Sequence, residues 1–557
     1  MLALGRLVEI RAAFGRRPAR EKLALLRMLE LASLPRPADV LGFHDTLCFL
    51  RAYPDDAPLL ARVSRMLAGF AQRADLRAHA RALADRGVAG TAIQFRFFWP
   101  TARWLAQRWP DRIAIDWEAF ENRDRLELFL PLLVHPAEVP ALDEYAYAMR
   151  AWVKRLAGAR ESDAAFLIQR FDAMPMDSFA REALWDELDV PITLSPGPDT
   201  PSRTLARARG KGFQFIRKPL SRERPDLTKA IHEKPRAVRT LGPREAQAMV
   251  DLARESMITR SRDLDVFAWG DPRDVRLIEF RDGLAFAMIG AIPERRLLLE
   301  SVYGFLTLKN HVPIGYVLTS ALFGSSEIAY NVFETWRGTE AAAIYGRVLA
   351  MTRQLFGSDT FTIFPYQLGQ GNDEAIASGA WWFYFKLGFR PREARIQRLA
   401  AREVARVRRD PRARSSAATL RRLATENLYF ATGRARSDIL GLFPIGNVGL
   451  AVTRELTRRF GSDRERAAEV WEQEAQEVLG VTDRGGFSDG ERDAWRRWAP
   501  IVSLIPGVAR WSAEEKKALV EVIRAKGGRR ESDFVWKLDA HARLRRALVR
   551  IAKSVEA

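Results

Sequence analysis

One residue in the middle of the chain has a type and position suited to proton donation. Tyr384 stands three residues before the run Leu387-Gly388-Phe389-Arg390-Pro391, near the end of a predicted helix. A tyrosine hydroxyl can donate a proton, so Tyr384 is a candidate general acid. Earlier in the chain, the apolar run 327–333, which opens with Glu327, reads as a strand.

The chain between them has the pattern of a phosphate site. The run 327–333 leads through Arg337 and Gly338 into a helical pattern from Ala341 onward. A strand that delivers its chain to a helix N-terminus places free backbone N–H groups and the positive end of the helix dipole at one spot. Gly338 lets the backbone approach a ligand closely.

The order strand, Arg-Gly turn, long helix, strand and aromatic helix over residues 326–391 resembles the GNAT superfamily of N-acetyltransferases, and the resemblance covers residues 236–395. In that family a loop of the form Arg/Gln-x-x-Gly-x-Gly/Ala holds the pyrophosphate of acetyl-coenzyme A, and residues 337–342 match it here. The resemblance implies acetyl-CoA, or another acyl-CoA, as the donor. The residues that it implies for binding this donor are Val332, Phe333, Arg337, Gly338, Thr339, Ala341, Ala342 and Asn372.

The resemblance also implies a reaction. A main-chain amide near residues 331–333 would polarise the thioester carbonyl, an amine would attack it, and Tyr384 would protonate the departing thiolate. Glu327 resembles the strand glutamate that serves as general base in one branch of the family. The chain would then be an acyl-CoA-dependent N-acyltransferase that acts on a small-molecule or peptide amine, whose identity the sequence does not give.

Two departures from the family pattern bear on this hypothesis. Glu340 occupies a position that is usually glycine, and a carboxylate close to a pyrophosphate is repelled. The alternatives are that Glu340 points away, that the donor is less anionic, or that the pocket takes no donor. Asn372 lies twelve positions before Tyr384, more than the two helical turns usual in the family, which predicts an extra turn or a kink.

Two other functions remain open. One is an aminoacyl-tRNA-dependent transferase of the same fold, whose hallmark is two tandem copies; only one copy is evident unless residues 90–195 contain a diverged second one. The other is a non-catalytic GNAT-like binding module that has lost coenzyme A. No Gly-x-Ser-x-Gly elbow or Walker-type Gly-Lys-Ser/Thr motif supports a different chemistry.

Composition narrows the class of protein. The 557 residues carry a formal net charge of +19, but the arginines are spread through every predicted helix, so nucleic acid is a partner that the sequence allows without favouring. The densest basic segment is 402–422, for which a solvated helix face is the simpler explanation. One cysteine and six scattered histidines predict neither a disulfide framework nor a metal site. With no signal peptide or membrane span in view, we expect a cytoplasmic, bacterial protein of unknown oligomeric state.

Breaker residues and changes of pattern predict an α/β protein in which a central GNAT-like mixed sheet is flanked by largely α-helical N- and C-terminal domains. Residues 1–195 read as a helical domain and 196–235 as a basic linker. Residues 236–395 read as the acyltransferase-like domain and 396–557 as a helical C-terminal domain. Ser488 and Ser512 each begin a capping-box pattern, which marks two helix starts in the last domain.

Overall fold

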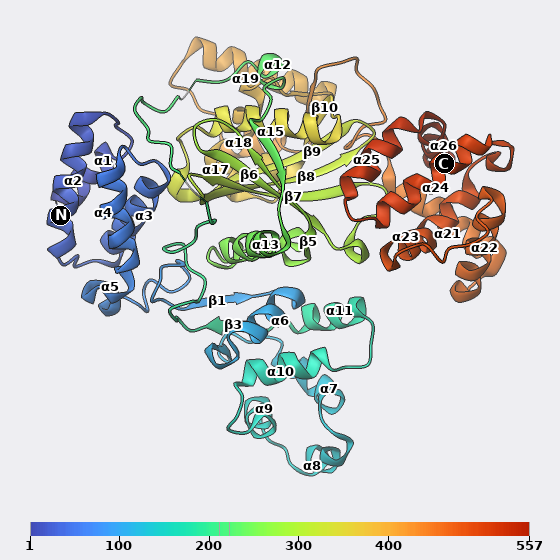
Figure 1. Ribbon diagram of the computed structural model, residues 1–557, viewed down its shortest axis with the longest axis horizontal. Coiled ribbons are helices and arrows are strands. Elements are labelled where there is room, and N and C mark those ends of the chain that lie inside the picture. Colours follow the sequence, from blue (N-terminus) through green and yellow to red (C-terminus); the bar gives the residue numbers. More distant parts are fainter. Residues whose placement is uncertain (1, 211, 222, 556–557) are drawn as a thin grey trace.

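The computed structural model describes residues 2–210, 212–221 and 223–555, and it confirms the predicted α/β class, with a mixed central sheet flanked by helical regions (Figure 1). The nine strands of the central sheet are β4 (Ala237–Thr240), β5 (Gly270–Glu279), β6 (Leu284–Ala291), β7 (Ser301–Lys309), β8 (Val312–Leu322), β9 (Ser325–Val332), β10 (Thr360–Ile363), β11 (Arg390–Pro391) and β12 (Leu428–Ala431). Their order across the sheet is β11-β12-β10-β9-β8-β7-β6-β5-β4.

The pairs β5–β6 and β7–β8 are tight hairpins. Each reverses through a pair of residues with positive φ, Asp282-Gly283 in the first and Asn310-His311 in the second. Such left-handed pairs match the right-handed twist of the strands they join. The sequence Asp-Gly signals the first turn directly.

Parallel pairing occurs at one place in this sheet, between β9 and β10, and α15 (Ala341–Phe356) connects the two strands. The pairing is short, since it joins Ser325–Glu327 to Thr360–Thr362 and goes no further. β9 then continues along β8 to Val332, whereas the chain leaves β10 at Ile363 and enters α16 (Pro365–Leu368). The two strands therefore diverge from a shared start, which opens a gap at their C-terminal ends.

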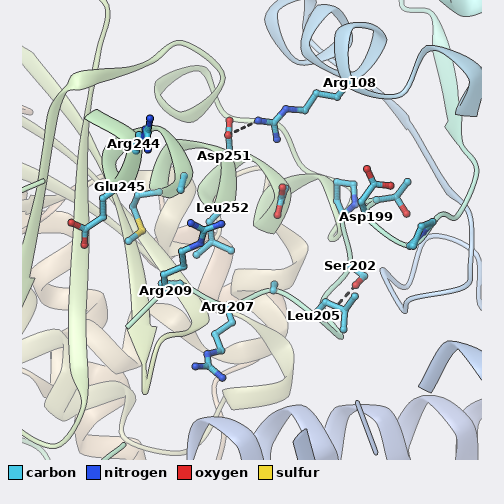
Figure 2. A pocket seen from close by; sticks show the side chains of 18 residues that line it. Arg108, Asp199, Ser202, Leu205, Arg207, Arg209, Arg244, Glu245, Asp251 and Leu252 are labelled. Atoms are coloured by element: carbon cyan, nitrogen blue, oxygen red, sulfur yellow. Dashed lines mark hydrogen bonds and ion pairs between the residues drawn. The ribbon is translucent and has the colours of Figure 1, made fainter. Parts of the chain in front are cut away.

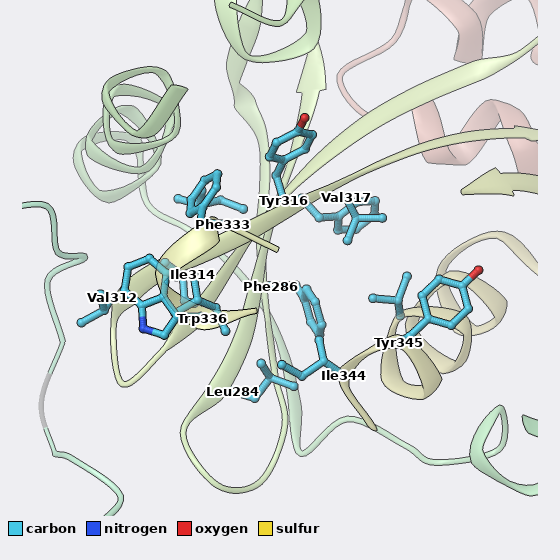
Figure 3. Close-up of a cluster of buried hydrophobic side chains, with 14 of the residues drawn as sticks. Leu284, Phe286, Val312, Ile314, Tyr316, Val317, Phe333, Trp336, Ile344 and Tyr345 are labelled. Carbon is cyan, nitrogen blue, oxygen red and sulfur yellow. The ribbon is translucent and has the colours of Figure 1, made fainter. Parts of the chain in front are cut away.

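Helices cover both faces of the sheet. α15 lies on one face, and α13 (Pro243–Ile258) lies on the other together with α14 (Asp265–Ala268) (Figure 1). Figure 3 shows the core under α15, where Phe286 of β6 and Val317 of β8 face Ile344 and Tyr345 of the helix. Successive side chains of a strand point to opposite faces of the sheet, so every second residue of β6 and of β8 faces α15.

The region that the sequence assigns to one helical domain, 1–195, consists of two different parts. Its first helices share one hydrophobic core with the central sheet; they are α1 (Leu2–Ile10), α2 (Arg16–Leu31), α3 (Pro37–Ala52), α4 (Ala57–Ala68) and α5 (Ala74–Ala78). Residues 93–194 have a core of their own and an antiparallel sheet in the order β1-β3-β2. The elements of this second part are β1 (Ile93–Arg96), α6 (Trp99–Arg108), β2 (Ile113–Ile115), α7 (Arg123–Leu133), α8 (Val139–Glu144), α9 (Met149–Ala157), α10 (Asp163–Asp172), α11 (Ser178–Leu188) and β3 (Pro191–Leu194).

The predicted linker, 196–235, follows the surface and contains α12 (Leu227–Ala230); residues 211 and 222 lie outside the described part of the chain. It is fixed by backbone hydrogen bonds, from Ala208 N–H to His311 O at 2.9 Å and from Ile216 N–H to Pro54 O at 2.8 Å. This segment therefore fastens the N-terminal helices to the central sheet.

The central domain extends beyond the expected boundary at residue 395. After α17 (Asp373–Ser378), α18 (Ala380–Lys386) and β11, the chain forms α19 (Ala394–Arg409) and α20 (Ala417–Leu423) and returns to the sheet as β12. β12 pairs with both β10 and β11, so it belongs to the central domain. The sequence pattern does not predict β12, because the strand is only four residues long.

The C-terminal helices form a separate core. They are α21 (Ile445–Phe460), α22 (Arg464–Leu479), α23 (Asp489–Leu504), α24 (Ala513–Gly527), α25 (Glu531–Ala540) and α26 (Ala542–Lys553). The capping boxes predicted at Ser488 and Ser512 are confirmed at the starts of α23 and α24. None of the helices in the described ranges combines the length and apolar character needed to cross a membrane.

Candidate functional site

A cavity of about 300 Å³ lies where β9 and β10 separate. Its wall is contributed by the end of β9, the loop before α15, and the helices α17 and α18. Its lining residues are Tyr330, Asn331, Val332, Arg337, Gly338, Ala341, Gln367, Asn372, Glu374, Ala375, Ser378, Ala380, Phe383 and Tyr384. A volume of this size is at the lower end of what small-ligand pockets usually offer.

One wall of the cavity consists of backbone that is free to bind an anion. Gly338 has a φ of 76°, a left-handed value that favours glycine, and the chain turns there into α15. The N–H groups of residues 338–343 donate no hydrogen bond to any part of the chain that the structure describes. Because α15 runs for 16 residues, its dipole adds positive potential at the same end.

Arg337 stands at the mouth of the cavity and is held by two groups. Its Nε donates to Val332 O at 3.1 Å, and its guanidinium forms an ion pair with Glu374 in the first turn of α17. Arg262 reaches the same carboxylate, at 3.5 Å. Glu374 is half-exposed, so an anionic ligand can compete with it for Arg337.

Glu340, the residue that departs from the family pattern, does not line the cavity. Its carboxylate accepts a hydrogen bond from Lys309 Nζ at 3.0 Å, and Lys309 is almost completely buried at the end of β7. The ammonium group compensates the charge of the carboxylate locally. The Glu340 side chain therefore leaves the free N–H groups accessible from the cavity side.

Tyr384 is buried in α18 and contributes to the opposite wall. Its ring packs edge-on against Tyr345 and Phe389, with centroids 5.4 and 5.9 Å away. Its hydroxyl makes no hydrogen bond with the described residues. Burial raises the pKa of this hydroxyl above its usual value, so it stays protonated at neutral pH and can donate a proton.

Glu327 lies at the narrow end of the gap, where β9 still pairs with β10, and is not among the lining residues. Asn331, which does line the cavity, is four residues further along β9, about 13 Å away. Burial, together with the nearby charge of Glu300, raises the pKa of the Glu327 carboxyl to about 7, and the hydrogen bond with the Ser320 hydroxyl partly offsets this shift. That pKa suits a general base, but the position requires water to connect it to the cavity.

The end of β9 offers one main-chain donor to the gap. Phe333 N–H is used, because it donates to Ile314 O of β8 at 2.9 Å. N–H groups alternate in direction along an antiparallel pair, so the N–H of Val332 points away from β8 toward the gap. Val332 is thus the residue in 331–333 whose amide can meet a ligand carbonyl.

The structure brings six of the ten predicted site residues together around the cavity: Val332, Arg337, Gly338, Ala341, Asn372 and Tyr384. Four lie elsewhere. Phe333 packs against Tyr316 and Trp336, Thr339 donates its hydroxyl to Trp336 O, Ala342 packs into the core, and Glu327 lies at the closed end of the gap.

Of the extra turn or kink expected between Asn372 and Tyr384, the structure has a break between two helices. Asn372 caps α17 by accepting from Ala375 N–H at 3.1 Å, and α17 ends at Gly379, which has a φ of 67° before α18 begins. Sequence reasoning missed Tyr330, Gln367 and Glu374 as lining residues. For Glu374 a partial signal exists, because acidic residues are favoured in the first turn of a helix, and Glu374 follows the Asn372 cap at the second helical position.

A larger cavity, of about 580 Å³, lies on the α13 side between that helix, the linker segment 198–209 and Arg108 (Figure 2). Arg108 reaches across its rim to Asp251 at 2.7 Å. Its wall carries four arginines and four acidic residues, namely Arg108, Arg207, Arg209, Arg244, Asp199, Glu245, Asp251 and Glu255. It contains none of the predicted residues and has no net charge to select a phosphate ligand.

Within the described residues, no group of three or more His, Cys, Asp or Glu side chains is arranged so that it could hold a metal ion.

Comparisons of the chain with family models, with curated proteins and with solved structures found no match.

Proposed function

We propose that the chain is an acyl-CoA-dependent N-acyltransferase whose donor lies in the gap between β9 and β10. The observation that carries this proposal is the cavity itself. It has unused N–H groups at the start of a long helix on one wall and a free, protonated tyrosine hydroxyl on the other. This pairing suits a ligand with a phosphate at one end and a leaving group that needs a proton at the other.

The N–H groups of residues 338–343 and the guanidinium of Arg337 would hold the pyrophosphate of the donor. The acyl thioester would extend along β9, where the N–H of Val332 donates to its carbonyl oxygen. Negative charge develops on that oxygen when the amine attacks, so the bond strengthens in the transition state.

Transfer forms a bond between the amine nitrogen and the acyl carbon and breaks the bond between that carbon and sulfur. The leaving thiolate takes a proton from Tyr384, and the proton lost by the amine returns to the tyrosinate through solvent. Glu327 would accept the proton that the ammonium form of the acceptor loses, through intervening water. A carboxyl with a pKa of about 7 is half ionised at neutral pH and can do this.

The antiparallel sheet of residues 93–194 does not support a tandem transferase, because it lacks the parallel strand pair of the central domain.

The proposed donor can be tested directly with acetyl-CoA. We expect millimolar acetyl-CoA to raise the melting temperature of the wild-type protein and to give a saturable signal in calorimetry.

The matched variants are Ala341→Glu and Gln354→Glu. Ala341 lines the cavity, whereas Gln354 is exposed in the last turn of the same helix, far from the proposed phosphate site. Glutamate at 341 adds a negative charge beside the pyrophosphate and should abolish the thermal shift, whereas glutamate at 354 should leave it in place. Absence of any shift in the wild type, or equal loss in both variants, refutes the proposed donor site.

A further inference from the structure

We propose that α19 and the groove beside it form a binding surface for single-stranded nucleic acid, an interaction that the acyltransferase proposal does not require. α19 lies on the outside of the central domain, beyond α18 (Figure 1). One side of it carries five arginines at helical spacing, which we call the basic face: Arg395, Arg398, Arg402, Arg406 and Arg409.

The charge of this region has few internal partners. Residues 394–422 contain ten arginines and two acidic residues, Glu403 and Asp410. Within the described residues, Arg398, Arg402, Arg408 and Arg409 form no ion pair with a carboxylate. Like charges three and four residues apart destabilise an isolated helix, so the fold gains nothing from this arrangement. An external polyanion would reverse that effect.

Cations from other segments converge on the same region. Lys386, at the end of α18, has an exposed side chain. The pKa of its ammonium group is lowered by partial desolvation and by the positive charges of Arg224 and Arg414. These three residues come from the linker, from α18 and from the loop after α19. The positive charge is therefore a property of the assembled surface, not of one helix alone.

A groove of about 640 Å³ runs along another side of α19 and shares Arg409 with the basic face. Its floor is apolar, formed by Phe385, Val404 and small residues of α19, and Arg408 and Arg409 lie along its wall. The guanidinium of Arg390 lies over the Phe385 ring, 4.3 Å from its centroid. Trp381 also stacks on the Phe385 ring, with centroids 4.8 Å apart, so the guanidinium plane of Arg390 is the surface on which an unpaired base can stack.

The same observations do not favour a membrane. None of the large hydrophobic side chains that are exposed in the described ranges lies within residues 390–422. A helix that inserts between headgroups presents Trp, Phe or Leu on its buried side, and the apolar side of α19, with Ile396 and Leu399, already packs on the protein. A positively charged surface without exposed large hydrophobic side chains is better suited to the phosphate backbone of a nucleic acid than to a membrane.

The experiment is fluorescence anisotropy with the full chain and a labelled 20-nucleotide RNA, with single-stranded DNA of the same sequence and with the corresponding duplex. The test variant is Arg398→Glu/Arg402→Glu. The control is Arg20→Glu/Arg27→Glu on α2, a helix of the same length, where both arginines are exposed and the net charge changes equally. Circular dichroism melting confirms that both variants are folded.

We expect the wild type to bind a single strand, with affinity that falls steeply as salt rises. The test variant should weaken binding at least tenfold, and it should lower the slope of log Kd against log salt by about 1.4, about 0.7 for each lost phosphate contact. The control variant should bind as the wild type does. Comparison of RNA with DNA then shows which strand the surface prefers.

A second variant tests the groove without changing the basic face. Ala405→Glu adds a carboxylate to the groove and should weaken binding, whereas Ala405→Gln, which matches it in size, should not. Equal binding by the test and control variants, absence of salt dependence, a preference for duplex, or sedimentation with phosphatidylserine vesicles that nucleic acid does not displace would each overturn the proposal. Failure of acetyl-CoA binding has no bearing on any of these results.

Discussion

Replacing Glu327 with glutamine should make the protein more stable at alkaline pH. The Glu327 carboxyl lies within β9, close to Glu300, in a position where burial disfavours its ionised form. Glutamine has nearly the same shape and stays neutral at every pH. The substitution therefore removes the cost of a buried charge without creating a cavity.

The magnitude follows from the pKa. Burial raises it from an ordinary 4.5 to about 7, and one pKa unit corresponds to about 1.4 kcal/mol, so the full effect is about 3 kcal/mol. The folded state binds the proton more tightly than the unfolded state does. The stabilising contribution of the protonated carboxyl is thus complete below about pH 4.5, falls as the pH rises toward 7, and is lost above pH 7.

Urea unfolding at pH 5 and at pH 8, followed by pulsed hydrogen exchange of the β8 and β9 amides, measures this difference in the part of the chain concerned. The Glu327→Gln variant should gain on the wild type at pH 8 and gain little at pH 5. The exposed Glu118, changed to glutamine, is the control and should gain at neither. A Glu327→Gln variant that is equally or less stable than the wild type at pH 8 refutes the assigned environment of this carboxyl.

Three further substitutions test the site. Tyr384→Phe should lower the turnover of acyl transfer about 100-fold, the usual contribution of a general acid, and leave acetyl-CoA binding unchanged in calorimetry; an unchanged turnover would exclude Tyr384 as the proton donor. Lys309→Met leaves the Glu340 carboxylate without its ammonium partner and should destabilise the fold by about 3 kcal/mol in urea unfolding, whereas an unchanged midpoint would show that the pair is dispensable. Glu374→Gln releases Arg337 from a half-exposed ion pair and should tighten acetyl-CoA binding up to about fivefold; weaker binding would mean that Glu374 positions the guanidinium.

Local patterns account for the parts of the fold that the sequence predicts. The capping boxes at Ser488 and Ser512 and the break between Asn372 and Tyr384 each depend on residues close together in the chain. The parts that differ depend on distant pairing. β12 has only four residues, and its place in the sheet comes from hydrogen bonds with β10 and β11.

The candidate site divides in the same way. The free N–H groups before α15 could be expected from the order of strand, turn and helix, because a helix start leaves its first amides unpaired whatever the side chains are. The fate of Glu340 could not, since it is set by Lys309, 31 residues earlier in the chain. From the sequence alone, a carboxylate in an anion-binding loop is expected to repel the ligand, and this expectation changes only when its counterion is known.

Glu374 shows the opposite case, in which an ordinary acidic residue of a helix's first turn bears on ligand binding. Its carboxylate forms an ion pair with Arg337, the side chain that a phosphate ligand would need, and another with Arg262 from the segment after α13. Two guanidinium groups converging on one half-exposed carboxylate show that this mouth attracts an anion even in the free protein. Because exposed ion pairs contribute at most about 1 kcal/mol, a pyrophosphate with several charge-assisted hydrogen bonds would displace Glu374 at little cost, and the two arginines would then share the ligand instead.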